Sequence, residues 1–376
     1  MRFRYSTDVN GKLVKKALVY TFEEHGIDNG DIDRQAIYIV ERLKANGFET
    51  YIVGGAVRDL ILGKKPKDFD IVTAANPARI KKIFHNARII GNRFRLVHVF
   101  FGPRIFEVST FRSIKDGPTG NIFGSIEDDV LRRDFTVNAL FYDPVKQIVV
   151  DFVGGMKDIK DKKIRPIIPI NKIFTDDPVR MIRAVKYGAV TGFKIPLLLH
   201  RKIKKQSSLL ASVSSSRLTE EIFKIIHSSC ADRIVDDLDN AGLYQYLQPS
   251  AAAMFKTDPG FKSQYLKSLS VLNTEEFKNL PGQTLSALIR DYLEKTADWT
   301  GTADPKIPLQ ERYKAAFIAA RKFVLPLNPP RIELDMAVKL LFAEHGVTVK
   351  RSRFPANSPR NSEAKKETKV IAKPHE

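Results

Sequence analysis

Two aspartates, Asp68 and Asp70, are separated by one residue in the segment DFDIVT. Side chains at positions i and i+2 of a β-strand point the same way, so the two carboxylates are predicted to project together while Phe69 turns into the core. Adjacent carboxylates repel each other, and a divalent cation between them relieves that repulsion. Hard oxygen ligands suit Mg²⁺, so the pair favours a magnesium site. The alternative is an acidic strand end that pairs in solvent with the lysines of the preceding loop.

A double glycine lies upstream of this pair. Residues 51–53 favour a strand and residues 56–62 carry apolar positions at helical spacing, with Gly54 and Gly55 between them. Such a turn lets a ligand approach the backbone and leaves N–H groups at the start of the helix, which favours an anion such as a triphosphate. Arg58 lies one turn into that helix. The segment is neither a Walker A loop nor a GxGxxG motif, and a purely structural turn is the alternative.

These segments belong to an ordered series of blocks: GGAVRD, DFD, IFEVSTFR, RRDFTVNAL, FVGGMKDIKDKKIR and DDPVRMIRAVKY. The series resembles the class II nucleotidyltransferases, the family of the bacterial poly(A) polymerases and the tRNA CCA-adding enzymes. The resemblance covers roughly residues 20–235. It implies an α/β head with the polymerase-beta-like nucleotidyltransferase fold, followed by an all-α neck and body.

The resemblance also implies roles for individual residues. Glu107 is the third carboxylate and completes the metal set of Asp68, Asp70 and Glu107, which is expected to hold two Mg²⁺ ions. The implied catalytic residues are Asp68, Asp70, Glu107 and Asp134. The predicted nucleotide-binding residues are Gly54, Gly55, Arg58, Arg133, Asp134, Asn138, Asp177 and Arg180. Asp134 is expected at the sugar, and Asp177 and Arg180 are expected to read the Watson–Crick edge of the base.

Each of these assignments has a structural alternative. Glu107 could be the cross-strand partner of an arginine such as Arg95, and Arg133 with Asp134 could be a charged helix start. Asp177 followed by proline is a common helix start. His98 has no metal-binding spacing and is interpreted as structural. Aromatic residues in the C-terminal half could stack on single-stranded RNA, although aromatics at helical spacing are more often core residues.

The order of the elements predicts the domain organisation. The expected parts are a polar, irregular N-terminal extension at 1–30, the catalytic head at 31–165, a helical neck that binds nucleotide and RNA at 166–235, a helical RNA-binding body at 236–349, and a disordered basic tail at 350–376. Helices are predicted at 31–46 and 78–84, and from about Lys194 onward. Residues 113–129 have the composition of a mobile loop that closes over substrate.

Charge and composition limit the choice of partner. The 62 Lys and Arg residues against 43 Asp and Glu give a net charge of +19, as expected for a nucleic-acid partner. An acidic membrane surface would attract the same charge, but no apolar run approaches the roughly 18 residues of a membrane span. The N-terminus lacks the apolar core of a signal peptide, and the single Cys230 cannot form an internal disulfide. We therefore expect a cytoplasmic protein without a membrane partner.

The resemblance implies template-independent polyadenylation of RNA 3′ ends, in which AMP is transferred from the substrate ATP and pyrophosphate is released. The alternative is a tRNA CCA-adding enzyme that uses CTP and ATP. The runs GNRFRLVHVFFGP and NIFGSIEDD are similar to the poly(A) polymerase subgroup and favour the first activity, in mRNA and other RNA 3′-end processing. A hypothesis from another class is an RNA-binding module with a decayed active site, but the carboxylates and the base-reading pair are all present. We expect a monomer.

Overall fold

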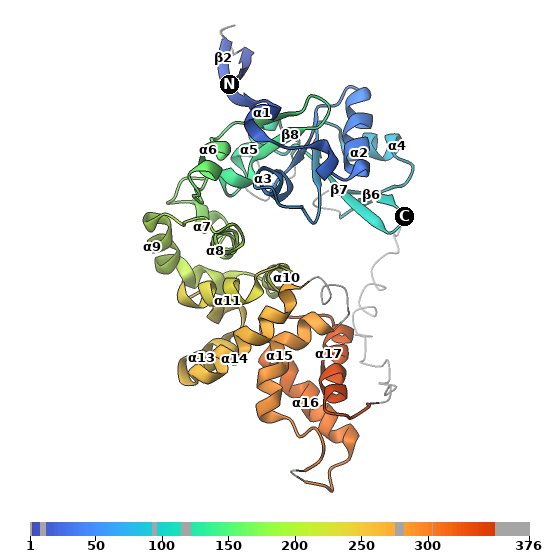
Figure 1. Ribbon diagram of the computed structural model, residues 1–376, viewed down its shortest axis with the longest axis vertical. Coiled ribbons are helices and arrows are strands. Elements are labelled where there is room, and N and C mark those ends of the chain that lie inside the picture. Colours follow the sequence, from blue (N-terminus) through green and yellow to red (C-terminus); the bar gives the residue numbers. More distant parts are fainter. Residues whose placement is uncertain are drawn as a thin grey trace, which may run out of the picture.

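A computed structural model describes residues 2–7, 13–91, 96–113, 122–274, 282–302 and 304–349. The chain forms an elongated molecule in which an α/β head is followed by a helical neck and a helical body (Figure 1). This order of elements confirms the predicted fold class. Three predictions concern residues outside the described ranges: Arg95 as a partner of Glu107, the stretch 114–121 of the predicted loop, and the tail at 350–376. The loop predicted at 113–129 is wrong at its C-terminal end, because residues 126–129 belong to a helix, α5 (Ile126–Leu131), which Ser125 caps.

The head is built on a nine-stranded mixed sheet. In spatial order its strands are β1 (Arg2–Thr7), β2 (Leu13–Tyr20), β9 (Ile148–Asp151), β8 (Leu140–Asp143), β3 (Thr50–Val53), β4 (Asp70–Thr73), β7 (Arg104–Thr110), β6 (Leu96–Phe101) and β5 (Ala87–Ile90). β4 and β7 are parallel, whereas the other neighbouring strands are antiparallel. Because a parallel pair needs a crossover connection, α4 (Pro77–Ile83) and the β5–β6 hairpin separate β4 from β7 along the chain.

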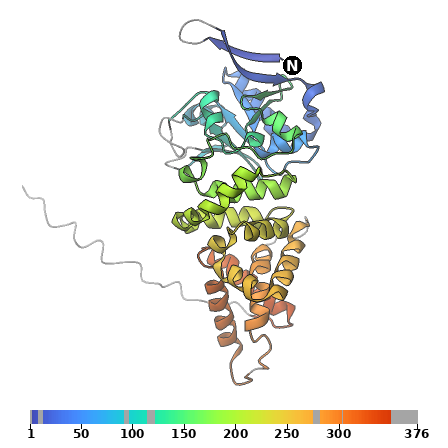
Figure 2. The ribbon, with the colours of Figure 1, turned by 90° about the vertical axis from the view of Figure 1, so that its left-hand side faces the viewer.

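The N-terminal region differs from the prediction. Residues 1–30 were expected to be irregular, and this is wrong: β1 and β2 form a hairpin, and β2 pairs with β9. Figure 2 shows the hairpin standing out from the head. The sequence pattern does not predict β2, because the strand buries the small Ala17, which is 3% exposed, while the consecutive residues Lys15 and Lys16 are both exposed. A register shift in the hairpin also breaks the alternation on which strand recognition depends.

Strand alternation gives the sheet two apolar faces. On β3, Ile52 joins the main core, whereas Tyr51 and Val53 join a smaller cluster on the other face. On β4, Ile71 and Val72 divide in the same way. Side chains of α2 (Arg34–Ala45), α3 (Gly55–Ile61) and α4 belong to the main core, and those of α5 (Ile126–Leu131) belong to the smaller cluster. The candidate site lies on the face of the smaller cluster, beside α5.

The predicted head helices are confirmed, with boundaries shifted by a few residues. The pattern at 31–46 is α2, that at 56–62 is α3, and that at 78–84 is α4. Asp33 caps α2 by accepting a hydrogen bond of 2.8 Å from the amide of Gln35. The other short helices of the head are α1 (Phe22–His25), η1 (Asn29–Asp31), η2 (Thr136–Asn138) and α6 (Gly155–Lys160).

The neck and body are helical, as predicted from about Lys194 onward. Their helices are α7 (Ile173–Asp176), α8 (Val179–Thr191), α9 (Leu197–Gln206), η3 (Ser207–Ser212), α10 (Ser215–Ile226), α11 (Ala231–Asn240), α12 (Tyr244–Leu247), α13 (Pro249–Thr257), α14 (Pro259–Ser270), η4 (Val271–Asn273), α15 (Gln283–Thr296), α16 (Leu309–Phe323) and α17 (Arg331–Glu344). Throughout the described ranges, no helix has the length and apolar character needed to cross a membrane.

The aromatic residues of the body are mainly core residues. Tyr244, Phe261 and Tyr265 are fully buried, and Phe255 packs between them. The hydroxyls of Tyr244 and Tyr265 lie 2.8 Å apart and both contact Gln248. Because these rings are enclosed, the structural interpretation is correct for them, and they do not form an RNA-stacking surface.

Candidate active site

The parallel pairing of β4 and β7 brings two predicted metal ligands together. Ile71 pairs with Val108, so Asp70 lies beside Glu107 one position earlier on each strand. Neighbouring strands are about 4.8 Å apart. Ile71 and Val108 point into the main core, and therefore Asp70 and Glu107 point to the opposite face. Both carboxylates line one pocket there.

Asp68 lies elsewhere. β4 begins at Asp70, so the prediction that both aspartates project from one strand is wrong. Asp68 is exposed and lines a neighbouring cleft. The neighbouring strand β3 ends at Val53, which pairs with Asp70, and Gly54 then turns the chain into α3, so β3 offers no partner to residues before Asp70. The charge of Asp68 still contributes to the raised pKa of Asp70, and its role as a metal ligand stays a prediction.

The two carboxylates in the pocket are compatible with a cation. Asp70 is open to the solvent in the pocket, but the protein atoms around it partly desolvate its carboxylate. This desolvation and the nearby charge of Glu107 raise the pKa of Asp70 to about 6. Negative charge is therefore costly at Asp70, and a cation shared with Glu107 would offset the cost. Within the described part of the chain, no group of three or more His, Cys, Asp or Glu side chains has the arrangement of a metal site. Of the three predicted carboxylate ligands, Asp70 and Glu107 line this pocket and Asp68 does not.

Glu107 also lies next to His98, which the sequence pattern indicated to be a structural residue. His98 faces Glu107 across the β6–β7 pair, and its Nε2 lies 3.7 Å from Oε1 of Glu107. Phe101 pairs with Arg104, so a two-residue turn joins the strands and sets this register. Counting back from that turn in the sequence would have predicted the His98–Glu107 pair.

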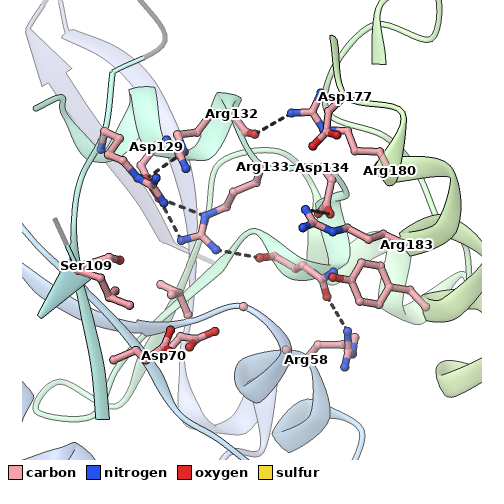
Figure 3. A pocket seen from close by; sticks show the side chains of 18 residues that line it. Arg58, Asp70, Ser109, Asp129, Arg132, Arg133, Asp134, Asp177, Arg180 and Arg183 are labelled. Carbon is pink, nitrogen blue, oxygen red and sulfur yellow. Dashed lines mark hydrogen bonds and ion pairs between the residues drawn. The ribbon is translucent and has the colours of Figure 1, made fainter. Parts of the chain in front are cut away.

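A cluster of arginines forms the wall opposite the carboxylates. Arg133 donates to Asp129 through Nε and Nη2, at 3.2 and 3.0 Å, and to the carbonyl of Asn138 through Nη1, at 3.2 Å. Arg58 donates to Oδ1 of Asn138 at 2.6 Å and to Asp59 through two nitrogens. These contacts fix both guanidinium groups while leaving N–H donors for a ligand. Figure 3 shows Arg133 reaching between the β7 side of the pocket and Asp134.

The positive charges in this cluster are poorly compensated by the protein. Burial, together with the charge of Arg112, lowers the pKa of Arg132 to about 10. Burial also lowers the pKa of Arg112 and of Arg180. Nη1 of Arg132 is buried and has no hydrogen-bond partner among the described residues. A polyanionic ligand in the pocket would relieve this repulsion, as expected for a triphosphate.

The neck closes the pocket from the other side. Asp177 precedes α8 and accepts hydrogen bonds of 2.9 and 3.0 Å from Arg217 in α10. Arg180 donates to the carbonyl of Arg132 at 3.4 Å and thereby links the neck to the head. Arg183 lies 3.8 Å from Asp134 and donates to Glu221 at 3.1 Å. Figure 3 shows Asp177, Arg180 and Arg183 approaching the pocket from the neck.

Head and neck together enclose a pocket of about 440 Å³. The predicted residues that line it are Gly54, Gly55, Arg58, Asp70, Glu107, Arg133, Asp134, Asn138, Asp177 and Arg180. Gly54 has φ +76° and ψ −140°, a backbone conformation that residues other than glycine rarely adopt. This conformation explains why the first residue of the pair is glycine. Lining residues that the sequence analysis missed include Arg112, Asp129, Arg132, Arg183 and Tyr187. Arg183 and Tyr187 follow Arg180 by about one and two helical turns, a spacing that could have identified them.

The pocket has paired carboxylates on one face of a sheet and arginines opposite them, and a helical neck completes it. This arrangement is that of a nucleotidyltransferase, with the carboxylates in its head. The family described as "Poly A polymerase head domain" matches residues 50–165. The one described as "Probable RNA and SrmB- binding site of polymerase A" matches residues 192–255. The chain belongs to the class II nucleotidyltransferase family.

Known proteins of two kinds resemble the chain. Poly(A) polymerase I of Escherichia coli O6:H1 is 42% identical over 249 residues, which are 62% of this chain and 54% of that protein. The CC-adding tRNA nucleotidyltransferase of Halalkalibacterium halodurans is 34% identical over 252 residues, 67% of this chain and 60% of that protein. The Bacillus stearothermophilus CCA-adding enzyme in complex with CTP superposes with a TM-score of 0.53 and 28% identity, over 83% of this chain and 82% of that one. The chain thus spans little more than half the length of the first two proteins.

Proposed function

We propose that this protein adds AMP units from ATP to the 3′ ends of RNA without a template. The observation that carries the proposal is the composition of one pocket. The neck contributes Asp177 and Arg180, the predicted base-reading pair, and the head contributes Asp70 and Glu107 with an arginine wall. A nucleotide with its base toward the neck would have its phosphates among the arginines and near the two carboxylates.

The proposed reaction forms a bond between the 3′ oxygen of the RNA and the α-phosphorus of ATP. The bridging bond between the α- and β-phosphates breaks and pyrophosphate leaves, while the hydroxyl proton passes to a carboxylate or to water. Asp70 and Glu107 would hold Mg²⁺ in the pocket, and Asp68, which lines the neighbouring cleft, is the predicted third ligand. Two Mg²⁺ ions, when bound, lower the pKa of the hydroxyl and compensate charge on the leaving group. The arginines bind and orient the triphosphate.

Adenylate rather than cytidylate addition is supported by the relatives. The poly(A) polymerase I is more similar to this chain, at 42% identity, than the CC-adding enzyme, at 34%. A second candidate function is CCA addition, which is favoured by the similarity to a CCA-adding enzyme in complex with CTP. The two activities use the same carboxylates and differ in the nucleotide accepted and in where addition stops.

An incorporation assay tests the proposal. The protein is incubated with Mg²⁺, labelled ATP or CTP, and either a single-stranded oligonucleotide or a tRNA that lacks its 3′-terminal CCA. Repeated AMP addition to both RNAs, with little CMP addition, is the expected result. Two CMP additions restricted to the tRNA would favour CCA addition instead. No incorporation of either nucleotide, with folding intact, would favour the RNA-binding module.

A further inference from the structure

A second cleft, of about 700 Å³, lies beside the nucleotide pocket on the head. Three segments form its walls: the loop between α3 and β4, the η1 region before α2, and the start of β7 at the tip of the β6–β7 hairpin. Apart from Asp68, no residue to which a function is assigned above lines this cleft. Its position relative to the carboxylates indicates what it binds.

The carboxylates stand at the boundary between the two cavities. Along β7, Ser109 and Glu107 line the nucleotide pocket, and Ile105 lines the second cleft. These three residues share one face of the strand, because the intervening Phe106 and Val108 belong to the main core. Ile105 is therefore the next side chain after Glu107 on that face, roughly 7 Å along the strand. Phe106 also lines the second cleft, which therefore includes the start of β7 on both faces of the strand.

The segment that leads from α3 into β4 also has one carboxylate in each cavity. Asp70 lines the nucleotide pocket, and Asp68 lines the second cleft. A molecule bound in the second cleft would reach the carboxylates from the side opposite Ser109.

The lining of the cleft suits a strand of nucleic acid. Lys64, Lys65, Lys67 and Arg104 line it, together with the carboxylates of Asp31, Asp33 and Asp68. Arg104 forms an ion pair with Asp33, so the three lysines supply the positive charge that the cleft offers to a ligand. The ammonium groups of Lys64 and Lys67 donate to neck carbonyls, at 3.2 Å to Val190 and 2.6 Å to His227, which holds the loop against the neck. Lys65 is exposed and makes no hydrogen bond or ion pair with the described residues. It is available to a phosphate group.

An apolar surface adjoins these cations. Ile105 is 52% exposed although it lies within a strand, and the half-buried Phe69 lines the same cleft. A nucleotide combines an anionic phosphate with an apolar base face, and this surface offers a partner for each. Neither a lysine nor an isoleucine discriminates between bases by hydrogen bonding. Binding is therefore expected to be independent of sequence.

We propose that the second cleft binds the 3′-terminal nucleotides of the RNA substrate, so that the RNA and ATP approach the carboxylates from two adjoining cavities. This inference rests on the proposed function. Lys65 contacts a backbone phosphate, and Ile105 packs against the terminal base. The 3′ hydroxyl then lies at the boundary formed by Glu107 and the segment from Asp68 to Asp70.

Steady-state kinetics with a labelled oligonucleotide test the cleft. Lys65→Glu is expected to raise the KM for RNA roughly fivefold and to reduce the slope of log KM against log salt by about 1. The KM for ATP is expected to stay within about twofold, because the lysine does not line the nucleotide pocket. Ile105→Ser is expected to raise the KM for RNA equally for all primer sequences. Lys160→Glu is the matched control, because α6 and the β6–β7 hairpin lie on opposite sides of the head (Figure 1).

A binding measurement separates this proposal from the proposed function. RNA binding is followed by fluorescence anisotropy without ATP, and a primer with a 3′-terminal 4-thiouridine is photo-crosslinked. Crosslinks to residues 63–69 or 104–106, together with weaker binding by Lys65→Glu, support the cleft even if no nucleotide is incorporated. Normal polymerisation with unchanged KM for RNA in both variants would overturn it. Crosslinks confined to the body would do the same.

Discussion

One guanidinium nitrogen of Arg217 donates hydrogen bonds to both carboxylate oxygens of Asp177, at 2.9 and 3.0 Å, and so connects α10 to the start of α8. Asp177 also accepts a hydrogen bond of 3.2 Å from the amide of Val179. The carboxylate is thus held from two directions at the edge of the nucleotide pocket. A base-reading group discriminates well only when its orientation is fixed, because a mobile carboxylate can adjust to a different base.

Arg217→Ala is expected to reduce nucleotide selectivity. Without the charged hydrogen bonds, Asp177 can rotate, so kcat/KM for ATP should fall about tenfold, which corresponds to about 1.4 kcal/mol. The ratio of kcat/KM for ATP to that for CTP should fall as well. Parallel kinetics with both nucleotides measure the change, and Arg201→Ala, at an exposed position of α9, is the control. An unchanged ratio would show that Arg217 has no part in base discrimination.

Asp70→Asn is expected to abolish nucleotide incorporation while the protein stays folded. Because partial desolvation in the pocket and the charge of Glu107 disfavour the charge of Asp70, removing that charge should leave thermal stability equal or higher when divalent ions are chelated. Mg²⁺ should raise the Tm of the unmodified protein and have little effect on Asp70→Asn. Calorimetry with Mg²⁺ or with EDTA measures both effects, and Asp161→Asn near α6 serves as the control. Full activity of Asp70→Asn would refute the catalytic assignment.

Arg133→Lys is expected to weaken ATP binding. Arg133 lines the pocket and uses three of its N–H groups on Asp129 and Asn138, which leaves two N–H donors for a ligand. Lysine keeps the charge but has only three donors on a single nitrogen, so it cannot hold this geometry and also bind phosphate. The KM for ATP should rise about tenfold, equivalent to about 1.4 kcal/mol, while RNA binding stays unchanged. Equal loss of ATP and RNA binding would point to misfolding instead.

Glu221→Gln is expected to change how stability depends on pH. Burial alone would raise the pKa of Glu221, but Lys186, Arg183 and Lys224 lower it to about 2. A folded-state pKa below the unfolded value gives stability above pH ~4.3 that is lost as the pH falls toward 2. The lowered pKa of Glu221 corresponds to at most about 3 kcal/mol of stability at neutral pH. The net contribution of the ion pairs is smaller, because burial lowers the pKa of the partner Lys186 and so disfavours its charge. Urea unfolding at pH 7 and pH 3 should show a smaller pH effect in Glu221→Gln than in the exposed neighbour Glu220→Gln.

Much of the site was predictable because its residues lie in short blocks whose spacing is interpretable. The glycine turn, Arg58 and the pair of Asp177 and Arg180 all line the pocket as expected. The position of Asp68 was not predictable from alternation, since alternation applies only inside a strand and β4 begins two residues later. The N-terminal hairpin was missed because a register shift and its exposed lysines conceal the period of two.

The sequence by itself determined the kinds of groups available: carboxylates, arginines and a glycine with a special backbone conformation, each in a local segment that dictates its own turn, strand or helix. Only the tertiary structure decided which of them meet. The parallel register of β4 and β7 brings Asp70 beside Glu107, and the packing of the neck on the head brings Arg183 to Asp134. The reason is physical: local spacing sets the direction of a side chain within its own element, whereas contacts between distant segments depend on how the whole core packs.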